Sequence, residues 1–265
     1  MKNTSTRPLS FWLLRIFTLC VAAFLIVPIA LSVLTGLTNN QFEGLSSGLT
    51  LKWVFKVWQD YQHSIWLSLK LAGACLVLTT LLGVPAAYVL ARSQGAVART
   101  MEELLMLPVA IPGLATALAL ITTYGAVGDF RTHWTFILVG HVLFTLPFMV
   151  RSVLAVMLSI DLHALEEGAR SLGASFVQRF FTIVLPNVRS GILAGALMVV
   201  TLSIGEFNMS LLLHTPFTQT LPVGLADAYA SLRIEVGSAY TIIFFFLIIP
   251  LLIALQWASA KTKRA

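Results

Sequence analysis

Long runs of apolar residues dominate the chain, and short polar segments separate them. Two shorter apolar runs, Trp134–Val150 and Ser190–Gly205, extend helically past one charged residue each. Four longer runs contain no charged residue: Ile16–Leu34, Leu71–Ala91, Leu104–Gly128 and Gly237–Ala260. A hydrocarbon core about 30 Å thick requires about 20 apolar residues in a helix. The pattern therefore predicts six transmembrane helices, at about residues 12–35, 65–91, 104–126, 134–157, 190–212 and 237–260.

The composition agrees with this pattern. Of the 265 residues, 58% are hydrophobic and 11% are charged, whereas a soluble domain is about 45–50% apolar and about 25% charged. The same values exclude intrinsic disorder, which requires low hydrophobicity and high charge. The 17 Lys and Arg residues are scattered between apolar runs, unlike the dense patch of a nucleic-acid-binding protein. We therefore expect an all-α membrane protein that forms a single transmembrane domain over residues 1–265.

The distribution of positive charge predicts the orientation in the membrane. With both termini inside, the inner segments hold twelve Lys and Arg residues and the outer segments hold five. This asymmetry satisfies the positive-inside rule, which the reversed topology would violate. The formal net charge of +6 then divides into +7 inside and −1 outside, so the basic character reflects topology.

Two glycines in the fifth predicted span have the spacing that lets helices approach closely. Gly191 and Gly195 are four residues apart, and such a pair removes side chains from one helix face. We interpret the pair as a helix-packing site rather than as a specific dimer contact.

The inner connection from about residue 159 to residue 189 is the most informative segment. Leu165–Gly173 has the pattern of a short helix that ends at a glycine. Phe176–Val184 has the pattern of a second short helix, with Phe176, Phe180 and Ile183 on one face and Pro186 just beyond its end. We therefore predict an L-shaped projection outside the membrane, between spans 4 and 5. An amphipathic hairpin lying on the membrane is the alternative.

The residues of this projection carry a family resemblance. Glu167-Gly168-Ala169, three residues, Gly173, nine residues, Ile183, one residue and Leu185-Pro186 resemble the cytoplasmic signature of type I ATP-binding-cassette importer permeases. That signature has alanine where this chain has Gly168. The resemblance extends to the six-span layout, and it is nearest to the polyamine, iron, phosphonate and sulfate permease group.

The resemblance implies a mode of coupling. In that family the segment is a coupling helix that docks into a separate ATPase subunit. Glu167 would then make the polar contact with the ATPase, beside Gly168 and Ala169, and Gly173 would supply the turn. Ile183, Leu185 and Pro186 would fix the second arm against the membrane end. The implied partners are two cytoplasmic ATPases, a second permease (a homologous chain or a copy of this one) and a periplasmic binding protein, at a bacterial inner membrane.

The chain itself is not expected to be an enzyme. Gly168 and Gly173 have the glycine spacing of a phosphate-binding P-loop, but Ala174 stands where the loop requires lysine, and no strand precedes it. No His, Asp and Glu cluster has metal-ligand spacing, and no Ser, His and Asp constellation can be argued. We expect no catalytic residue, no metal and no cofactor.

Polar residues within the spans are candidates for the translocation path. A charged residue at the bilayer centre costs about 2.5–3.5 kcal/mol, so we expect Glu206, with Asn208 nearby, to face a cavity. The other interpretation, that the span ends at Gly205 and Glu206 lies at the interface, stays open. His141 is interpreted as a hydrogen-bonded packing residue, with a gate or proton relay as the alternative.

The sequence thus predicts the permease subunit of an ATP-driven importer for a small solute. A mildly negative outer face and Glu206 favour a polyamine-like cation such as spermidine or putrescine, and an organophosphonate, iron or sulfate is the alternative. Two rival functions are an ATP-independent secondary transporter or channel and a membrane-embedded enzyme. A secondary transporter predicts inverted repeats or several buried charges, and an enzyme predicts polar catalytic groups at one depth. The sequence shows neither pattern.

Overall fold

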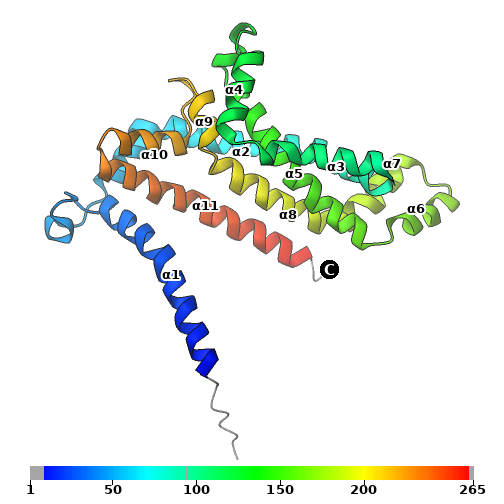
Figure 1. The fold of residues 1–265 in the computed structure, drawn as a ribbon, viewed down its shortest axis with the longest axis horizontal. Coiled ribbons are helices and arrows are strands. Elements are labelled where there is room, and N and C mark those ends of the chain that lie inside the picture. The colour runs from blue at the N-terminus through cyan, green and yellow to red at the C-terminus, as the bar shows by residue number, and fades with distance from the viewer. Residues whose placement is uncertain (1–8, 94, 263–265) are drawn as a thin grey trace, which may run out of the picture. The chain divides into compact units, whose positions relative to one another are not determined.

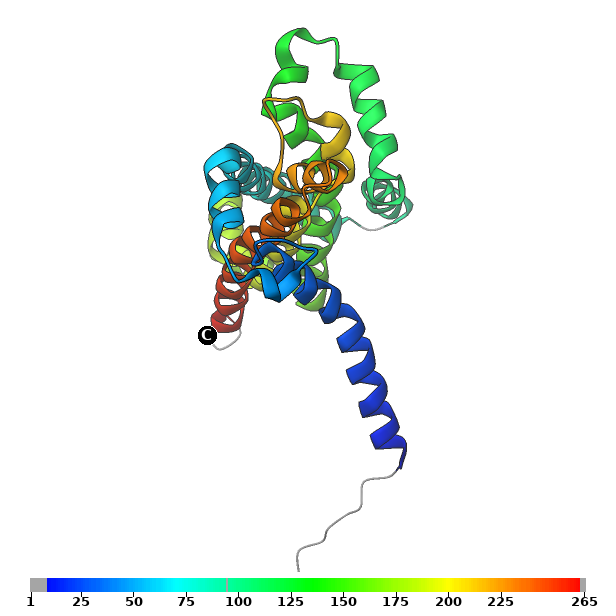
Figure 2. The ribbon, with the colours of Figure 1, turned by 90° about the vertical axis from the view of Figure 1, so that its left-hand side faces the viewer.

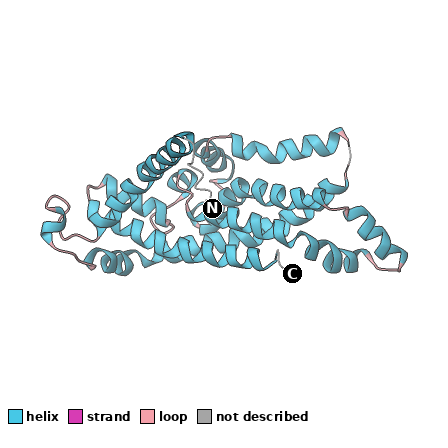
Figure 3. Cartoon of the chain, turned by 90° about the horizontal axis from the view of Figure 1, so that it is seen from below, coloured by secondary structure: helices cyan, strands magenta, loops and turns pink. Residues whose placement is uncertain are grey.

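The computed structural model describes residues 9–93 and 95–262, and the described elements are helices joined by loops (Figure 3). The all-α membrane class that the sequence predicts is confirmed. Residues 1–8 and 263–265 lie outside this part, and they include four of the charges counted on the inner side, Lys2, Arg7, Lys263 and Arg264. The chain divides into two compact units, residues 1–60 with 225–243 and residues 61–224 with 244–265.

The first unit is built on helix α1 (Leu9–Gly36), which is labelled in Figure 1. Apolar side chains are exposed along α1 on all sides, including Leu14 at 66% and Phe24 at 78%, as expected of a helix surrounded by lipid. The C-terminal end of α1 lies against the first turns of α11 (Ile234–Thr262), since a Cβ atom at Gly36 would be 2.8 Å from the Ser238 carbonyl carbon. A short 3₁₀ turn, η1 (Gly44–Ser47), follows in the loop after α1.

The second unit contains most of the helices. Its centre is the pair of α5 (Trp134–Ser159) and α8 (Leu185–Ile204), which pack along their length. Helix α2 (Lys52–Arg92), from Tyr61 onward, contributes to the same apolar core. The remaining elements are α3 (Ala96–Ala110), α4 (Gly113–Tyr124), η2 (Gly128–Thr132), α6 (Leu162–Ser171), α7 (Phe176–Arg179), η3 (Phe180–Val184), α9 (Asn208–Leu213) and the first part of α10 (Leu221–Ala230).

The glycine pair of α8 does form a close helix contact. A Cβ atom at Gly191 would be 2.7 Å from the carbonyl oxygen of Ser152, and one at Gly195 would be 3.2 Å from the Cα atom of Met149. Ser152 and Met149 both belong to α5. The helix-packing interpretation of Gly191 and Gly195 is therefore confirmed, because the backbone of α5 lies against Gly191 and the side chain of Met149 lies against Gly195, with its Sδ atom 2.6 Å from the Cβ position.

Five helices in the described part of the chain are long and apolar enough to span a membrane, or six if α3 and α4 form one span. Helices α3 and α4 meet at an angle of 99°, visible in Figure 2, where α3 is seen end-on and α4 rises from it. The break lies at Ile111 and Pro112, and Pro112 is the N-cap of α4. The predicted third span is thus a bent helix pair, and Ile111, just before Pro112, has the extended backbone angles that proline favours in the residue before it.

The predicted fifth span is interrupted as well. Helix α8 ends at Ile204, Gly205 is its C-cap, and α9 begins only at Asn208. In a hydrocarbon environment such irregular backbone is tolerated only where protein covers it or where it lines a cavity.

The prediction that a second short helix ends before Pro186 is wrong, because the chain is helical from Phe176 to Ile204. The backbone N–H of Leu185 bonds to the carbonyl of Phe180, five residues earlier, in the π-helical turn η3. Pro186 then falls in the first turn of α8, where its missing N–H is not needed. The π turn therefore allows the helix to continue past Pro186, although the sequence pattern predicts that the helix ends before this proline.

Candidate coupling site and polar cluster in the spans

The first arm of the predicted projection is helix α6. The side chain of Asp161 caps its N-terminus by accepting a hydrogen bond from the backbone N–H of Ala164 at 3.1 Å. The chain leaves the helix through Gly173, whose φ of 83° lies in the left-handed region that favours glycine. Ser175 and Gln178 then form a capping box at the start of α7. Local signals in the sequence thus set where each arm begins and where the chain turns between them.

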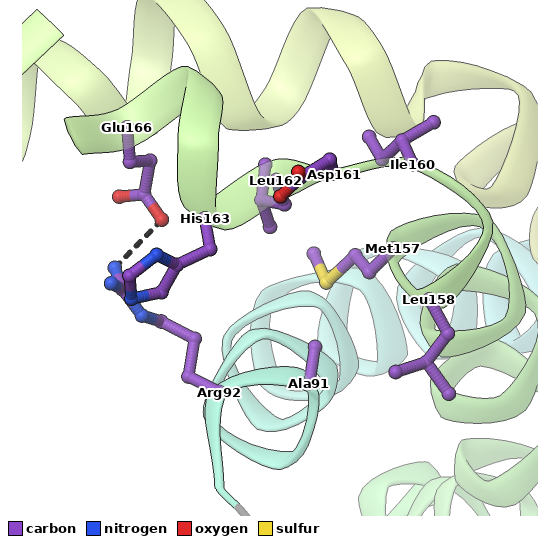
Figure 4. Close-up of a pocket in the computed structure, with 9 residues that line it drawn as sticks. All are labelled: Ala91, Arg92, Met157, Leu158, Ile160, Asp161, Leu162, His163 and Glu166. Carbon is purple, nitrogen blue, oxygen red and sulfur yellow. Dashed lines mark hydrogen bonds and ion pairs between the residues drawn. The ribbon is translucent and has the colours of Figure 1, made fainter. Parts of the chain in front are cut away.

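The two adjacent acids of α6 have different environments. Glu166 is 1% exposed, and its carboxylate accepts hydrogen bonds from Arg92 Nη1 at 2.7 Å and from Tyr88 Oη at 2.9 Å. Figure 4 shows the side chains of Glu166 and Arg92 pointing toward one another from α6 and α2. They line a pocket of about 220 Å³ with His163 and six neighbouring residues. Glu166 therefore binds α6 to the last turns of α2.

Glu167 faces the other way. Its side chain is 65% exposed, and it lies 3.4 Å from the ring of His163 one helical turn earlier. Leu165 of the same helix and Leu172 at its C-cap are exposed at 45% and 90%, and a Cβ atom at Gly168 would have no atom within 4 Å. Glu167 and Gly168 are therefore open, and this segment also exposes apolar side chains.

The other residues of the predicted coupling motif lie farther along the segment. Ala169 is half-buried in α6, and Gly173 is exposed at the turn. Ile183 and Leu185 are half-buried, with Leu185 packed against the apolar core, and Pro186 is exposed. The second arm is thus seated on the helices of the core, while the tip of the first arm is open.

A second polar cluster lies within the predicted spans, around the break between α8 and α9. His141 of α5 is 1% exposed, and its two ring nitrogens lie 2.9 Å from the hydroxyl oxygens of Ser203 and Ser210. These contacts are those of a hydrogen-bonded packing residue. Glu206 is 8% exposed, and its carboxylate lies 3.8 Å from His141 Nε2.

The carboxylate of Glu206 also binds the first turn of α9. It accepts hydrogen bonds at 2.9 Å from the backbone N–H groups of Met209 and Ser210. At the other end of α9, Arg131 Nη2 donates to the carbonyl of Leu212 at 2.9 Å. Side chains from outside α9 therefore hold both ends of this short helix.

The two breaks in the predicted spans lie next to each other. A Cβ atom at Gly113, the first residue of α4, would be 3.2 Å from Cβ of Asn208 and 3.7 Å from Oε1 of Glu206. Asn208 is exposed. A pocket of about 240 Å³ opens beside the second break, lined by Glu206, Asn208 and five neighbours. Glu206 thus lines a pocket while its oxygens bind backbone N–H groups.

Residues 79–264 match the family of binding-protein-dependent transport system inner membrane components. The chain belongs to this family. This inner-membrane family agrees with the resemblance that residues 167–186 carry, and with the apolar helices that are long enough to span a membrane.

Relatives within the family differ in the solutes that their names give. Sulfate permease 2 of Chlamydomonas reinhardtii chloroplasts is 28% identical, over 97% of this chain and 71% of its own length. The molybdate/tungstate transport system permease protein WtpB of Pyrococcus furiosus is 29% identical, over 77% and 80%. The spermidine/putrescine transport system permease protein PotC of Escherichia coli is 25% identical, over 93% and 94%.

A solved structure shares the fold. The bacterial alginate ABC transporter, in complex with a periplasmic protein that holds an alginate pentasaccharide, aligns with a TM-score of 0.74. The alignment covers 94% of both chains at 16% sequence identity. The two chains therefore share a fold along nearly their whole lengths.

The sequence pattern did not identify Tyr88, Arg92 and Glu166 as a site. Arg92 follows an apolar run, where the sequence pattern predicts only an inner positive charge. Adjacent residues on a helix point about 100° apart, so Glu166 and Glu167 could not share one face. That geometry gives the two acids different directions, and the partners of Glu166 show which one faces inward.

Proposed function

We propose that the chain is the permease subunit of an ATP-driven importer, with both termini on the cytoplasmic side. The family match over residues 79–264 carries the proposal. The importer takes up a small solute that an extracytoplasmic binding protein delivers, and a second permease, homologous or identical, completes the membrane pathway. Residues 1–265 act as one transmembrane domain in this assembly. The permease itself performs no chemistry.

The open segment of α6 around Glu167 and Gly168 is the proposed docking face for the ATPase. Glu167 supplies a carboxylate for a cation of the ATPase, and the exposed Leu165 and Leu172 supply apolar area. A Cβ atom at Gly168 would have no atom within 4 Å, so glycine or alanine fits at this position. ATP binding in two ATPase subunits would displace residues 159–189 and tilt the bundle between outward and inward access.

Co-purification tests this proposal. The solubilised wild-type complex is expected to contain the ATPase, and Glu167→Arg is expected to reduce both the bound ATPase and solute uptake. Glu103→Arg is the matched control, because it reverses an exposed acid of α3 outside the docking face. If wild-type material contains no ATPase, the importer proposal is wrong and an ATP-independent transporter becomes the better explanation. If Glu167→Arg and Glu103→Arg behave alike, the docking face lies elsewhere.

The breaks at residues 111–112 and 205–207 are the proposed lining of the translocation path. Irregular backbone, the exposed Asn208 and the pocket beside Glu206 support this assignment. His141 contributes by holding Ser203 and Ser210 rather than by contacting solute.

The proposed solute is a small oxyanion such as sulfate or molybdate. The names of two of the compared relatives support it, and the oxygens of Glu206 already bind two backbone N–H groups rather than standing free for a cation. A polyamine is the second candidate, supported by the match to PotC along 93% of this chain. ATP-dependent uptake of labelled sulfate, molybdate and spermidine into proteoliposomes with the cognate binding protein distinguishes them. Uptake of spermidine alone would refute the oxyanion assignment.

A further inference from the structure

We propose that Glu166, Arg92 and Tyr88 form a tether that makes the inner end of α2 move together with the coupling segment, residues 159–189. The inference rests on the proposed function, because it concerns how movement of that segment reaches the membrane helices. It assigns a positioning role to three residues outside the docking face.

The tether is a closed set of hydrogen bonds around one buried charge. Arg92 Nη1 lies 2.7 Å from Glu166 Oε2 and 2.6 Å from Tyr88 Oη, and the tyrosine hydroxyl lies 2.9 Å from Glu166 Oε1. Each of the three residues contacts the other two. Glu166 is 1% exposed, so separating it from Arg92 would leave a buried carboxylate without its cation, which is costly. The contact is therefore expected to persist when the segment moves.

Tyr88 connects α2 with the second arm as well. Its ring packs edge-to-face on Phe180, with the ring centroids 5.5 Å apart, and on Phe176 at 6.0 Å. The hydroxyl of Tyr88 holds α6, while its ring holds α7 and η3. One residue of α2 thus contacts both arms of the projection, and a displacement of either arm acts on the same turn of α2.

Helix α2 continues from this turn into the core of the second unit. Cys75 Sγ lies 3.1 Å from the hydroxyl oxygen of Thr145 in α5, and Ala72 packs with Val200 and Ile204 at the end of α8. Ile204 immediately precedes the break at residues 205–207. From Ala72 to Arg92 α2 has helical backbone angles, with Pro85 inside it, so a displacement of its inner end would act on the helix end beside the proposed path.

The experiment measures the amount of solute moved per ATP hydrolysed in proteoliposomes, together with the amount of ATPase that co-purifies. Glu166→Gln removes the buried charge, and Tyr88→Phe keeps the ring but removes the hydroxyl. For both variants we expect normal ATPase binding and a decrease in solute per ATP of about five-fold or more, the lower limit of typical coupling between sites. Asp227→Asn is the matched control, because it breaks an exposed ion pair with Arg233. It should leave the ratio unchanged.

A charge exchange separates coupling from folding. Arg92→Glu should lower the amount of solute moved per ATP. The addition of Glu166→Arg should restore it at least in part, because the acid and the base have then exchanged positions and can pair again. An unchanged ratio in both Glu166→Gln and Tyr88→Phe would overturn the tether, as would a decrease explained entirely by lost ATPase binding. If Glu166→Gln does not fold, Tyr88→Phe decides the question, because it retains the Glu166–Arg92 pair. Wild-type protein without ATPase would instead refute the proposed function.

Discussion

Replacement of Gly191 by alanine is the most direct test of the helix packing at the centre of the second unit. The new Cβ atom would lie 2.7 Å from the carbonyl oxygen of Ser152 and 3.0 Å from the Cα atom of Val153. Both are backbone atoms of α5, so no side-chain rotation relieves the overlap. Either α5 or α8 must shift, and overpacking of this kind costs about 1–3 kcal/mol. Alanine also gains up to about 1 kcal/mol of helix propensity over glycine, so the overlap must be measured against a control.

Gly73→Ala is that control. Gly73 lies within α2, and a Cβ atom there would have no atom within 4 Å. The propensity gain is therefore the same, without overlap. The free energies of unfolding of the two variants should differ by the overlap cost of about 1–3 kcal/mol. At about 2–4 °C per kcal/mol this corresponds to a melting temperature lower by roughly 2–12 °C for Gly191→Ala.

The assay is thermal unfolding of both variants and the wild type in one detergent, followed by intrinsic tryptophan fluorescence. Uptake by Gly191→Ala should also decrease, because α8 leads directly to the break at residues 205–207. Equal melting temperatures for Gly191→Ala and Gly73→Ala would show that α5 and α8 do not approach as closely as described, and would refute the reasoning.

Three further substitutions test other parts of the molecule. Gly168→Ala should raise the stability of α6 by up to about 1 kcal/mol and leave ATPase co-purification at the wild-type level, and a loss of bound ATPase would show that the docking face requires glycine. Glu206→Ala leaves the N–H groups of Met209 and Ser210 without their acceptor, at about 1–3 kcal/mol for each buried group. Its melting temperature should fall, and wild-type stability would contradict the capping role. Arg131→Met should lower stability by a smaller amount, measured in the same thermal assay, since it removes donors to the last carbonyls of α9 while keeping the apolar stem.

Much of the architecture could be predicted from local patterns. Apolar runs of about 20 residues predict membrane helices whatever their neighbours are. The glycine spacing of α8 indicated a close contact, and the defined spacing from Glu167 to Pro186 indicated the family. These features depend on residues that are near each other in the sequence, so a linear pattern contains them.

The breaks in the predicted spans were harder to predict. Proline within a transmembrane helix is often tolerated, as with Pro147 inside α5, so Pro112 alone did not predict a 99° bend. For Pro186 the pattern predicts a helix end, but the helix continues past it through the π turn η3. In each case the outcome depends on which hydrogen bonds the surrounding helices make possible.

The sequence by itself determined the membrane class, the family and the location of the segment that carries the family resemblance. Only the tertiary structure decided that Glu166 faces inward and Glu167 outward. The reason is that the partners of Glu166, Arg92 and Tyr88, are 74 and 78 residues away along the chain. It likewise decided that Glu206 binds the backbone of α9 while it lines a pocket. Hydrophobic periodicity shows which side of a helix is buried. A buried charge also requires a specific partner, and only the packing of distant helices brings that partner close.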